Sequence, residues 1–401
     1  MIANAEWAAR FKQELTGNIL PFWMRHTVDR ENGGFHGAVD CDLRVDRHAP
    51  RASVINSRIL WTFSAAARSL GDAAYRETAD WAYDYIADKF WDKEFGGVYW
   101  MLDWHGQPTS DRKQIYAQAF AIYGLAEYYR ATGRAESLEG AKQLYRLIEE
   151  KSGESEYGGY LEARARDWSA LEDLRLSEKD LNCPKSMNTH LHVLEAYTNL
   201  LRVWDDPGLR ASLKGLLKVT MDRIMDRASA HFKMFFDNQW NSLTDHVSFG
   251  HDIEGSWLMQ EAAEVLGDGS MLNSARDLAV RMARAAYEQG LDVDGSLFYE
   301  ASQGRLVDPN KHWWAQAEAV VGFYNAYQVC GEERFRTAAW QAWEYIEDKV
   351  VDKIHGEWHA KLQPDGTPWT ADEDADACLV GAWKCPYHNG RVCLEMMDRL
   401  D

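Results

Sequence analysis

The chain has 401 residues, of which 46% are hydrophobic, 27% are charged and only 9 are proline. This composition excludes intrinsic disorder and collagen-like or low-complexity chains. Lys and Arg number 44 and Asp and Glu 63, so the net charge is −19. Such an acidic chain is not expected to bind nucleic acid or anionic membrane surfaces.

The start of the chain and its cysteines predict a cytoplasmic protein. Residues 1–16 lack the apolar core of an export signal, and no run of apolar residues is long enough to span a bilayer. The six cysteines form no C-x-x-C pair, which argues against a disulfide framework or a structural zinc site. They are Cys41, Cys183, Cys330, Cys378, Cys385 and Cys393.

Six short segments rich in glycine and aromatic residues recur along the chain. Their composition and Asp-x-x-Gly turns are typical of β-hairpins. In chain order they begin at Gly33, Phe95, Tyr157, Phe232, Gly295 and Gly356. The 18 tryptophans are also unusually many; we expect helix packing to account for more than half of them and the others to line a wall or cleft.

Apolar residues at i, i+3, i+4 and i+7 predict a pair of helices for each of these segments. In chain order the pairs are 4–26 and 55–71, 74–91 and 113–133, 135–151 and 186–205, 208–228 and 251–267, 271–288 and 311–331, and 333–350 and 386–399. Turn residues close several of them, including Gly71, Gly133, Pro207, Gly267 and Gly331.

Six hairpin-linked helix pairs predict an all-α fold, an (α/α)6 barrel of twelve helices with short β-hairpins between them. The second helix of each pair, such as 311–331, is apolar almost all round, so these six should form a buried inner ring. An open α-solenoid would need polar capping repeats, and the sequence has none. Without a linker rich in Pro, Gly or Ser, we expect one domain over residues 1–401.

Each predicted inner helix begins with polar residues that a buried helix has no packing reason to carry. Inner helices of such a barrel run parallel, so their N-termini should meet at one mouth and favour a developing anion there. These polar starts are residues 56–58, 113–116, 186–192, 251–254, 311–314 and 387–391.

Helical spacing indicates which side chains at the mouth share a face. Residues three or four apart do so, whereas His190 and His192 diverge by about 200° and should not face the same ligand. The pairs that share a face are His251 and Glu254, His388 and Arg391, Asn188 and His192, and Trp314 and Glu318.

A lone histidine on a helix is more often a cap or core residue than a catalytic group. Three histidines on different helices, beside an arginine, favour acid–base chemistry at the mouth. No cluster of His, Asp or Glu has the spacing of a metal site, so we predict neither a metal nor another cofactor.

At these positions the sequence resembles the cellobiose 2-epimerase family, a part of the larger N-acylglucosamine 2-epimerase group. The resemblance covers nearly the whole chain, and its segments are long and specific: NSRILWTFSAA, KQIYAQAFAIYGLAEYYRATG, RLSEKDLNCPKSMNTHLHVLEAYTNL, FGHDIEGSWLMQEAAEVLG, KHWWAQAEAVVGFYNAYQ and WKCPYHNGRVCLE. It implies an (α/α)6 barrel, in agreement with the helix count. Departures are Phe249 and Gly255, where Tyr and Ala are expected, and a longer, acidic approach to Trp383.

The resemblance implies that reducing-end glucose of a β-1,4-linked disaccharide, such as cellobiose or lactose, is converted to mannose through an enediolate. In this scheme His388 takes the C2 proton from glucose and His251 returns a proton to the opposite face, both with pKa values near neutrality. One group acting on a rotating intermediate is the alternative. His192 assists ring opening or binds near O1, and Arg58 stabilises the enediolate.

Other residues are expected to hold the sugar. Glu254 either orients His251 or binds a hydroxyl, and two tryptophans form stacking walls. The expected hydroxyl binders are Tyr116, Asn188, Asp180 and Glu318; the walls are Trp314 and Trp383, with Trp313 and Trp240 as weaker candidates.

Two other enzyme classes and a binding protein stay open at this stage. A monosaccharide isomerase or 2-epimerase of the mannose or N-acylglucosamine type would share the histidines and differ in its outer subsite. An (α/α)6 glycoside hydrolase would need two carboxyl groups flanking the bond. A non-catalytic sugar-binding protein would leave the histidine pair without a role. The only partner that we expect is a small sugar. We expect the protein itself to be a monomer or a weak homodimer.

Overall fold

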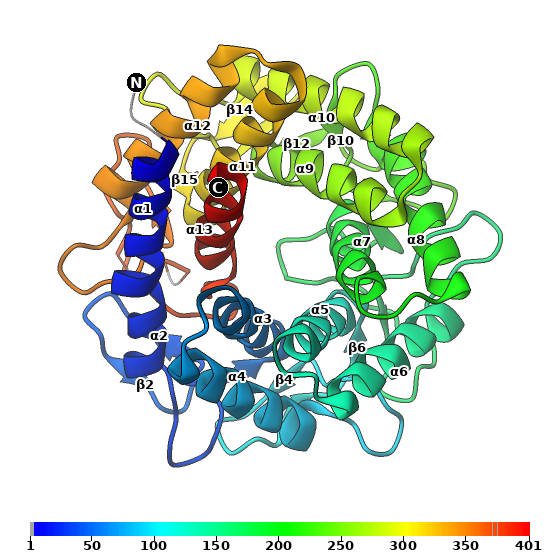
Figure 1. Cartoon of the computed structure of the whole chain (residues 1–401). Coiled ribbons are helices and arrows are strands. Elements are labelled where there is room, and N and C mark those ends of the chain that lie inside the picture. Colours follow the sequence, from blue (N-terminus) through cyan, green and yellow to red (C-terminus); the bar gives the residue numbers. More distant parts are fainter. Residues whose placement is uncertain (1–3, 371, 375) are drawn as a thin grey trace.

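Six inner helices lie side by side around a central axis in the computed structural model, which describes residues 4–370, 372–374 and 376–401 (Figure 1). Each inner helix packs against the next one, and the last packs against the first, so the ring is closed. The inner helices are α3 (Ser53–Leu70), α5 (Ile115–Thr132), α7 (Met187–Leu201), α9 (Phe249–Leu266), α11 (Trp313–Cys330) and α13 (Tyr387–Leu400).

An outer ring of helices surrounds the inner ring, and π-helical turns interrupt or end four of its members. Its segments are α1 (Asn4–Glu14), η1 (Leu15–Ile19) and α2 (Leu20–His26), α4 (Ala73–Tyr85) and η2 (Ile86–Phe90), α6 (Ala135–Lys151), α8 (Pro207–Val219) and η3 (Thr220–Ile224), α10 (Gly269–Gln289), and α12 (Glu333–Tyr345) and η4 (Ile346–Val350). Because α1, η1 and α2 are continuous, the described residues hold six helix pairs. The predicted (α/α)6 barrel is confirmed.

Local sequence explains where these helices end and how closely they approach. Gly71 and Gly133, with φ of 72° and 71°, end α3 and α5 in the left-handed conformation that glycine adopts most easily. Within α5, a Cβ on Gly124 would lie 2.6 Å from the Ser57 carbonyl oxygen of α3, so only glycine permits this close helix contact. None of the helices in the described part of the chain is long and apolar enough to cross a membrane.

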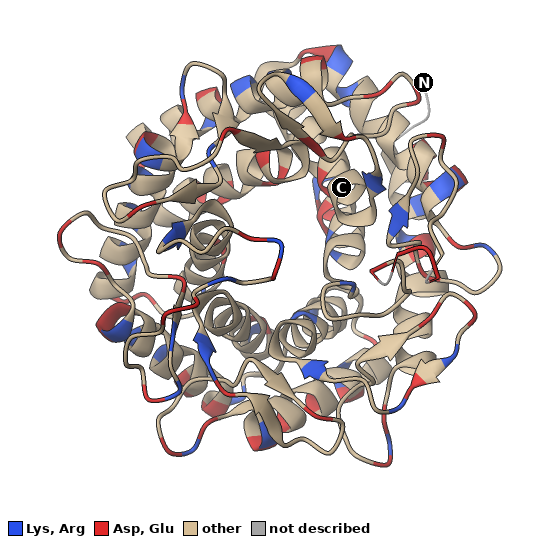
Figure 2. Ribbon diagram, turned by 180° about the vertical axis from the view of Figure 1, so that it is seen from behind, with Lys and Arg blue, Asp and Glu red and all other residues tan. Residues whose placement is uncertain are grey.

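Short antiparallel strands connect successive helix pairs as well as forming hairpins (Figure 2). The predicted hairpins include β1–β2, β4–β5 and β13–β14, while β3–β4, β6–β7, β8–β11, β12–β13 and β15–β16 link one pair to the next. A bridge between Val39 and Val380 joins the last unit to the first. The sequence did not predict this belt of linking strands.

The bounds of the strands are as follows: β1 (Ala38–Val39), β2 (Val45–Asp46), β3 (Arg51–Ala52), β4 (Met101–Leu102), β5 (Pro108–Ser110), β6 (Lys113–Gln114), β7 (Ala163–Arg164), β8 (Lys185–Ser186), β9 (Met225–Asp226), β10 (His231–Phe232), β11 (Phe235–Phe236), β12 (His246–Ser248), β13 (Glu300–Ser302), β14 (Arg305–Asp308), β15 (Lys311–His312) and β16 (Lys361–Leu362).

Buried ion pairs hold the start of most inner helices to the preceding turn. The ammonium group of Lys113 lies 2.9 Å from a carboxylate oxygen of Asp92, and that of Lys311 lies 2.6 Å from Asp292. The sequence pattern had placed both lysines among the polar residues of the mouth. They belong instead to strands β6 and β15 and pair with acidic residues of the preceding turns. Helices α5 and α11 therefore begin two residues later than predicted.

Candidate active site

The predicted catalytic residues come together at the N-terminal end of the inner ring. His192 lies on α7, His251 on α9 and His388 on α13, all within the first two turns of their helices. The Trp314 ring of α11 lies close to two of them, with its centroid 4.6 Å from that of His251 and 5.6 Å from that of His388. The Tyr116 ring of α5 lies 5.0 Å from His192.

Each of the three histidines is held through its Nδ1 atom. His388 Nδ1 lies 2.7 Å from Glu318 Oε1, and His192 Nδ1 lies 2.9 Å from Glu195 Oε2. Glu195 is ionised because its pKa is lowered, so it only accepts hydrogen bonds. Burial raises the pKa of Glu318, but both of its oxygens already accept hydrogen bonds, from Arg391 and Trp257. In both pairs the histidine Nδ1 therefore carries the proton and Nε2 is the free acceptor. His251 Nδ1 contacts Ser248 Oγ at 2.8 Å, which leaves its tautomer open.

Burial keeps the three histidines neutral. It lowers the pKa of His251 to about 3, and the nearby His192 and Arg58 add to this shift. Burial also lowers the pKa of His388 well below its usual value, and the positive charges of Arg58 and Arg391 lower it further. The pKa of His192 is lowered as well. The expectation of pKa values near neutrality is therefore wrong for the unliganded site, because the histidines lie deeper than expected and beside two arginines.

Arg58 provides a fixed positive charge beside the histidines. The side chain is buried, and its Nη2 donates a hydrogen bond to the Tyr116 hydroxyl at 2.7 Å. The guanidinium also lies over the rings of Phe120 and Tyr387, at 4.1 and 4.9 Å from their centroids. Its Nε atom is buried and has no hydrogen-bond partner among the described residues. A buried guanidinium with an unused donor is suited to stabilise an oxyanion.

A second buried arginine, Arg391 of α13, connects three carboxylates beneath the histidines. Its Nη2 lies 2.6 Å from both Glu254 Oε1 and Glu318 Oε1, and its Nη1 donates to Glu195. Glu195 and Arg391 are the site residues that the sequence analysis did not assign. The sequence did contain a signal for both residues. Glu195 follows His192 by three residues, and Arg391 follows His388 by three, which is the spacing of side chains that share a helix face.

This network corrects the expectation that Glu254 orients His251 and shows what Glu318 contacts, while hydroxyl binding by either carboxylate stays a prediction. Glu254 does not orient His251, whose Nδ1 contacts Ser248; it accepts from Arg391, and its Oε2 is buried without a partner. Glu318, expected to bind a sugar hydroxyl, holds His388 and accepts from the Trp257 indole at 3.0 Å. The sequence placed these residues on the correct helices, but the hydrogen-bond partners of Glu254 and Glu318 come from other helices.

Three of these side chains could in principle hold a metal ion. One ligand atom from each of Glu254, Glu318 and His388 lies within 4.8 Å of the others, although the sequence spacing had indicated no such cluster. Spacing within one helix could not reveal the group, because its members come from α9, α11 and α13. The Arg391 guanidinium already lies against both carboxylates and supplies the positive charge that a metal would bring.

The remaining predicted sugar binders lie around the same end of the ring. Asn188 presents a buried Oδ1 without a hydrogen-bond partner. Trp383 is 36% exposed, and its ring lies 6.1 Å from those of both Trp100 and Tyr116. Trp240, a weaker candidate, packs against His190 and donates to a backbone carbonyl, so its indole serves the structure of the preceding loop.

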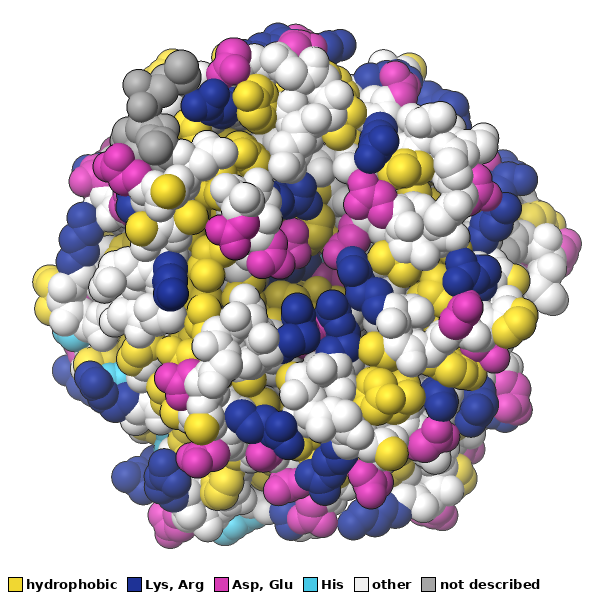
Figure 3. All heavy atoms as spheres, in the orientation of Figure 1, with side chains coloured by type: hydrophobic (Ala, Val, Ile, Leu, Met, Phe, Trp, Pro, Cys, Tyr) yellow, Lys and Arg dark blue, Asp and Glu magenta, His cyan; other side chains and the backbone are white. Residues whose placement is uncertain are grey.

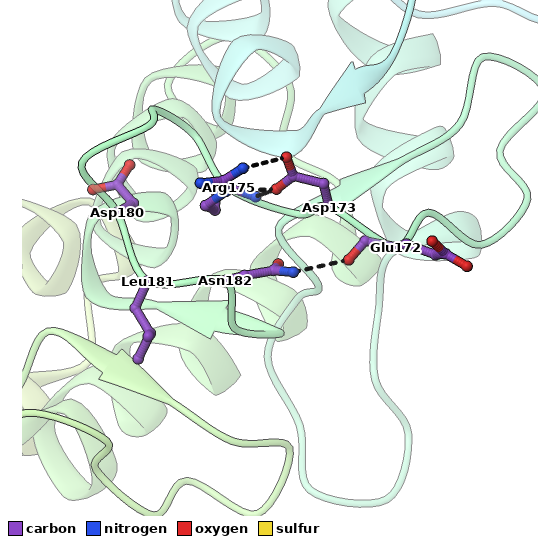
Figure 4. Close-up of a pocket in the computed structure, with 6 residues that line it drawn as sticks. All are labelled: Glu172, Asp173, Arg175, Asp180, Leu181 and Asn182. Atoms are coloured by element: carbon purple, nitrogen blue, oxygen red, sulfur yellow. Dashed lines mark hydrogen bonds and ion pairs between the residues drawn. The ribbon is translucent and has the colours of Figure 1, made fainter.

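Asp180 lies in the long loop between β7 and β8, part of which reaches over the central opening (Figure 2). Its Oδ2 accepts hydrogen bonds from the backbone and hydroxyl of Ser177, and burial raises its pKa. Residues of this loop line a shallow, open pocket of about 380 Å³ (Figure 4). Lys179 forms an ion pair with Asp376 at 2.7 Å, which connects this loop to the acidic segment before Trp383.

Gly255, one of the departures from the expected family pattern, has a steric explanation. A Cβ at this position would lie 2.1 Å from the Phe232 ring, so the alanine expected there does not fit beside this phenylalanine. The adjustment is confined to the side of α9 that faces β10, and His251 and Glu254 keep their places at the start of the same helix.

Comparisons with known proteins show the family of the chain. The N-acylglucosamine 2-epimerase family model matches residues 33–378. A cellobiose 2-epimerase of Bacteroides fragilis is 46% identical over 96% of this chain and 97% of its own. The structure of the cellobiose 2-epimerase from Bacillus thermoamylovorans superimposes with a TM-score of 0.93 at 41% identity, covering 98% of this chain and 99% of that one. A D-mannose isomerase, with a TM-score of 0.84 and 22% identity, shares the fold. The chain belongs to the N-acylglucosamine 2-epimerase family, among its cellobiose 2-epimerases.

Proposed function

We propose that this chain is a cofactor-free 2-epimerase that interconverts reducing-end glucose and mannose in β-1,4-linked disaccharides such as cellobiose and lactose. The observation that carries the proposal is that His251 and His388 both lie against the Trp314 ring and near the buried cation Arg58. Two neutral imidazoles near one fixed positive charge are suited to move a proton at a carbon next to a carbonyl.

The reaction begins with ring opening, because the hydrogen on C2 is acidic only when C1 is an aldehyde. His388 then takes the C2 proton at its Nε2, since Glu318 holds its Nδ1 as the protonated nitrogen. The electron pair from the C–H bond forms the enediolate, whose negative oxygen Arg58 stabilises. Because the pKa of His388 is low, its imidazole is already neutral at neutral pH and can accept the C2 proton at once.

The second half of the reaction returns a proton to the opposite face of C2. We assign this step to His251, which retains more exposed surface than His388 and can take a proton from water. The enediolate charge favours the imidazolium form of His251 while the intermediate is bound. His388 releases its own proton to water afterwards, so protons balance over the cycle.

A disaccharide fits this site better than a single sugar. Trp383 and the loop that carries Asp180 lie beyond the histidines, and they provide an exposed aromatic face and hydroxyl partners for a second ring. Relatives that are 46% and 41% identical to this chain also carry the cellobiose 2-epimerase name. A glycoside hydrolase is disfavoured because Glu254 and Glu318 are both held by Arg391 and flank no accessible position.

The proposal is tested by incubating the protein separately with cellobiose, lactose, mannose and N-acetylglucosamine, with and without EDTA, and identifying the products. We expect epimerised disaccharides, intact glycosidic bonds and equal rates with EDTA, since Arg58 and Arg391 supply the positive charge. Turnover of mannose or N-acetylglucosamine alone would indicate a monosaccharide enzyme. Loss of turnover on chelation, restored by a divalent ion, would indicate a metal-dependent isomerase.

Two further expectations belong to this proposal. We expect the protein in the cytoplasm, as a monomer or weak homodimer. Fractionation and light scattering would test them.

A further inference from the structure

Glu195 connects opposite sides of the inner ring at the floor of the site. From α7, its Oε2 accepts a hydrogen bond from His192 Nδ1 at 2.9 Å. Its Oε1 accepts from the Tyr387 hydroxyl and from Arg391 Nη1, both on α13. In the closed ring α7 and α13 are separated by two helices on each side, so this carboxylate spans the interior.

The environment keeps Glu195 ionised. Burial alone would raise its pKa, but Arg391 and the hydrogen bonds from His192 and Tyr387 outweigh burial and hold the pKa at about 2. Removing this carboxylate would leave Arg391 with two acidic partners instead of three. At any pH at which sugars are handled, Glu195 therefore acts only as a hydrogen-bond acceptor.

An acceptor at Nδ1 determines the tautomer of His192. The proton must sit on Nδ1, which leaves the lone pair on Nε2. Nε2 makes no hydrogen bond to any other described residue and is not among the enclosed, unpartnered atoms. The ring stands edge-on to Tyr116, whose hydroxyl is bonded to Arg58. His192 thus offers a free acceptor next to the group that receives the developing oxyanion.

We propose that Glu195 is a positioning residue for ring opening, because it holds His192 in the tautomer whose Nε2 accepts the proton of the anomeric hydroxyl. This inference rests on the proposed function. In the step, the O1–H bond breaks as the proton moves to Nε2, C1=O1 forms and C1–O5 breaks. The imidazolium then delivers the same proton to O5, so that the net change is the transfer of one proton from O1 to O5.

The test separates ring opening from proton transfer at C2 by using a substrate that is already open. A 4-linked disaccharide with 5-deoxyglucose at its reducing end has neither a free O4 nor an O5, so it cannot close a furanose or pyranose ring. Wild type, Glu195→Gln and Glu195→Asp would each be assayed on cellobiose and on this analogue. Glu127→Gln is the matched control, since Glu127 is equally buried and binds two arginines at the other end of the ring.

For Glu195→Gln we expect kcat on cellobiose to fall about 100-fold, as for lost acid–base assistance, with KM changed less than about 3-fold. Its rate on the open analogue should stay within about 3-fold of wild type, and Glu195→Asp, which keeps the charge, should recover much of the cellobiose rate. Glu127→Gln should keep the wild-type ratio between the two substrates.

Equal losses on both substrates would show that Glu195 only supports the floor of the site, and the proposal would be overturned. Unchanged turnover of cellobiose by Glu195→Gln would overturn it as well. If Glu195→Gln does not fold, the ratio of the two rates in Glu195→Asp decides, because a purely structural role would lower both rates together. A wild-type protein that leaves cellobiose unchanged would instead refute the proposed function itself, and this inference with it.

Discussion

The two ends of the inner ring carry charged side chains in contrasting ways. At the C-terminal end, charges from neighbouring helices pair with each other: Arg68 Nε lies 2.7 Å from Glu127, and Arg202 lies 2.6 Å from Glu261. Arg202 and Glu261 line a hollow of about 590 Å³ on the face shown in Figure 3. At the N-terminal end, Arg58, Arg391, His192 and His388 are buried and His251 is half-buried, among aromatic rings.

The difference lies in which polar atoms have partners. At the N-terminal end Arg58 Nε, Asn188 Oδ1 and Glu254 Oε2 are buried without hydrogen bonds. A buried unpaired polar group costs about 1–3 kcal/mol, so a fold does not retain several of them in one place without a use. The C-terminal pairs are partly exposed and satisfied, as expected of contacts that join helices. The contrast supports the proposal that the chemistry takes place at the N-terminal end, while the pairs at the C-terminal end join helices.

Removal of either catalytic histidine should produce the largest effect. We expect His251→Ala and His388→Ala each to lower kcat/KM by about 10²–10⁴-fold, because each loses a proton-transfer group. Circular dichroism and thermal melting would confirm that the barrel stays folded. Near-normal turnover by either folded variant would remove that residue from the mechanism.

Substitution of the fixed cation should have the next largest effect. Arg58→Lys keeps a positive charge but loses the planar fork held by Tyr116, Phe120 and Tyr387, so kcat should fall about 10²-fold. Steady-state kinetics on cellobiose would measure it. A fully active Arg58→Lys variant would mean that a point charge is sufficient and that the geometry of the guanidinium is irrelevant.

The pH dependence should reflect the burial of the histidines. Catalysis needs His388 neutral in the free protein, and its pKa lies well below 6.5, as does that of His251 at about 3. The neutral form therefore persists as the pH falls, and the acidic limb of kcat/KM should lie clearly below pH 6.5. A profile that loses half its rate at pH 6.5 or higher would contradict the neutral resting state.

A substitution at the C-terminal end should affect stability alone. Arg202→Ala removes a partly exposed ion pair with Glu261, so we expect a loss of at most about 1 kcal/mol in the free energy of unfolding. Its kcat and KM on cellobiose should match wild type. A large loss of activity without a loss of stability would show that the two ends of the ring are not independent.

Much of the fold was predictable because its signals are local. The apolar periodicity of 311–331 and the turn glycines Gly71 and Gly133 are read along one segment, and the structure confirms them. The polar starts of the inner helices correctly indicated the end at which Arg58, His192, His251 and His388 gather. Their roles at that end stay predictions until they are measured.

The errors all concern contacts between segments. Helical spacing placed His251 and Glu254 on one face, but it could not show that Arg391 from another helix would bind Glu254. It could not separate Lys113, which pairs with Asp92 of the preceding turn, from residues that face the site. Glu195 was missed because its partners Tyr387 and Arg391 lie across the ring. Such pairings depend on the closure of the barrel, which a periodic pattern does not specify.

The central claim is that a histidine exchanging with water moves the proton at C2 while the glycosidic bond stays intact. Turnover of cellobiose in D2O, followed by NMR of the product, tests it most directly. The account predicts deuterium at C2 of the mannose-ended disaccharide and no free monosaccharide. An unlabelled product after many turnovers would contradict proton transfer through solvent-exchanging groups, and release of glucose would show hydrolysis instead.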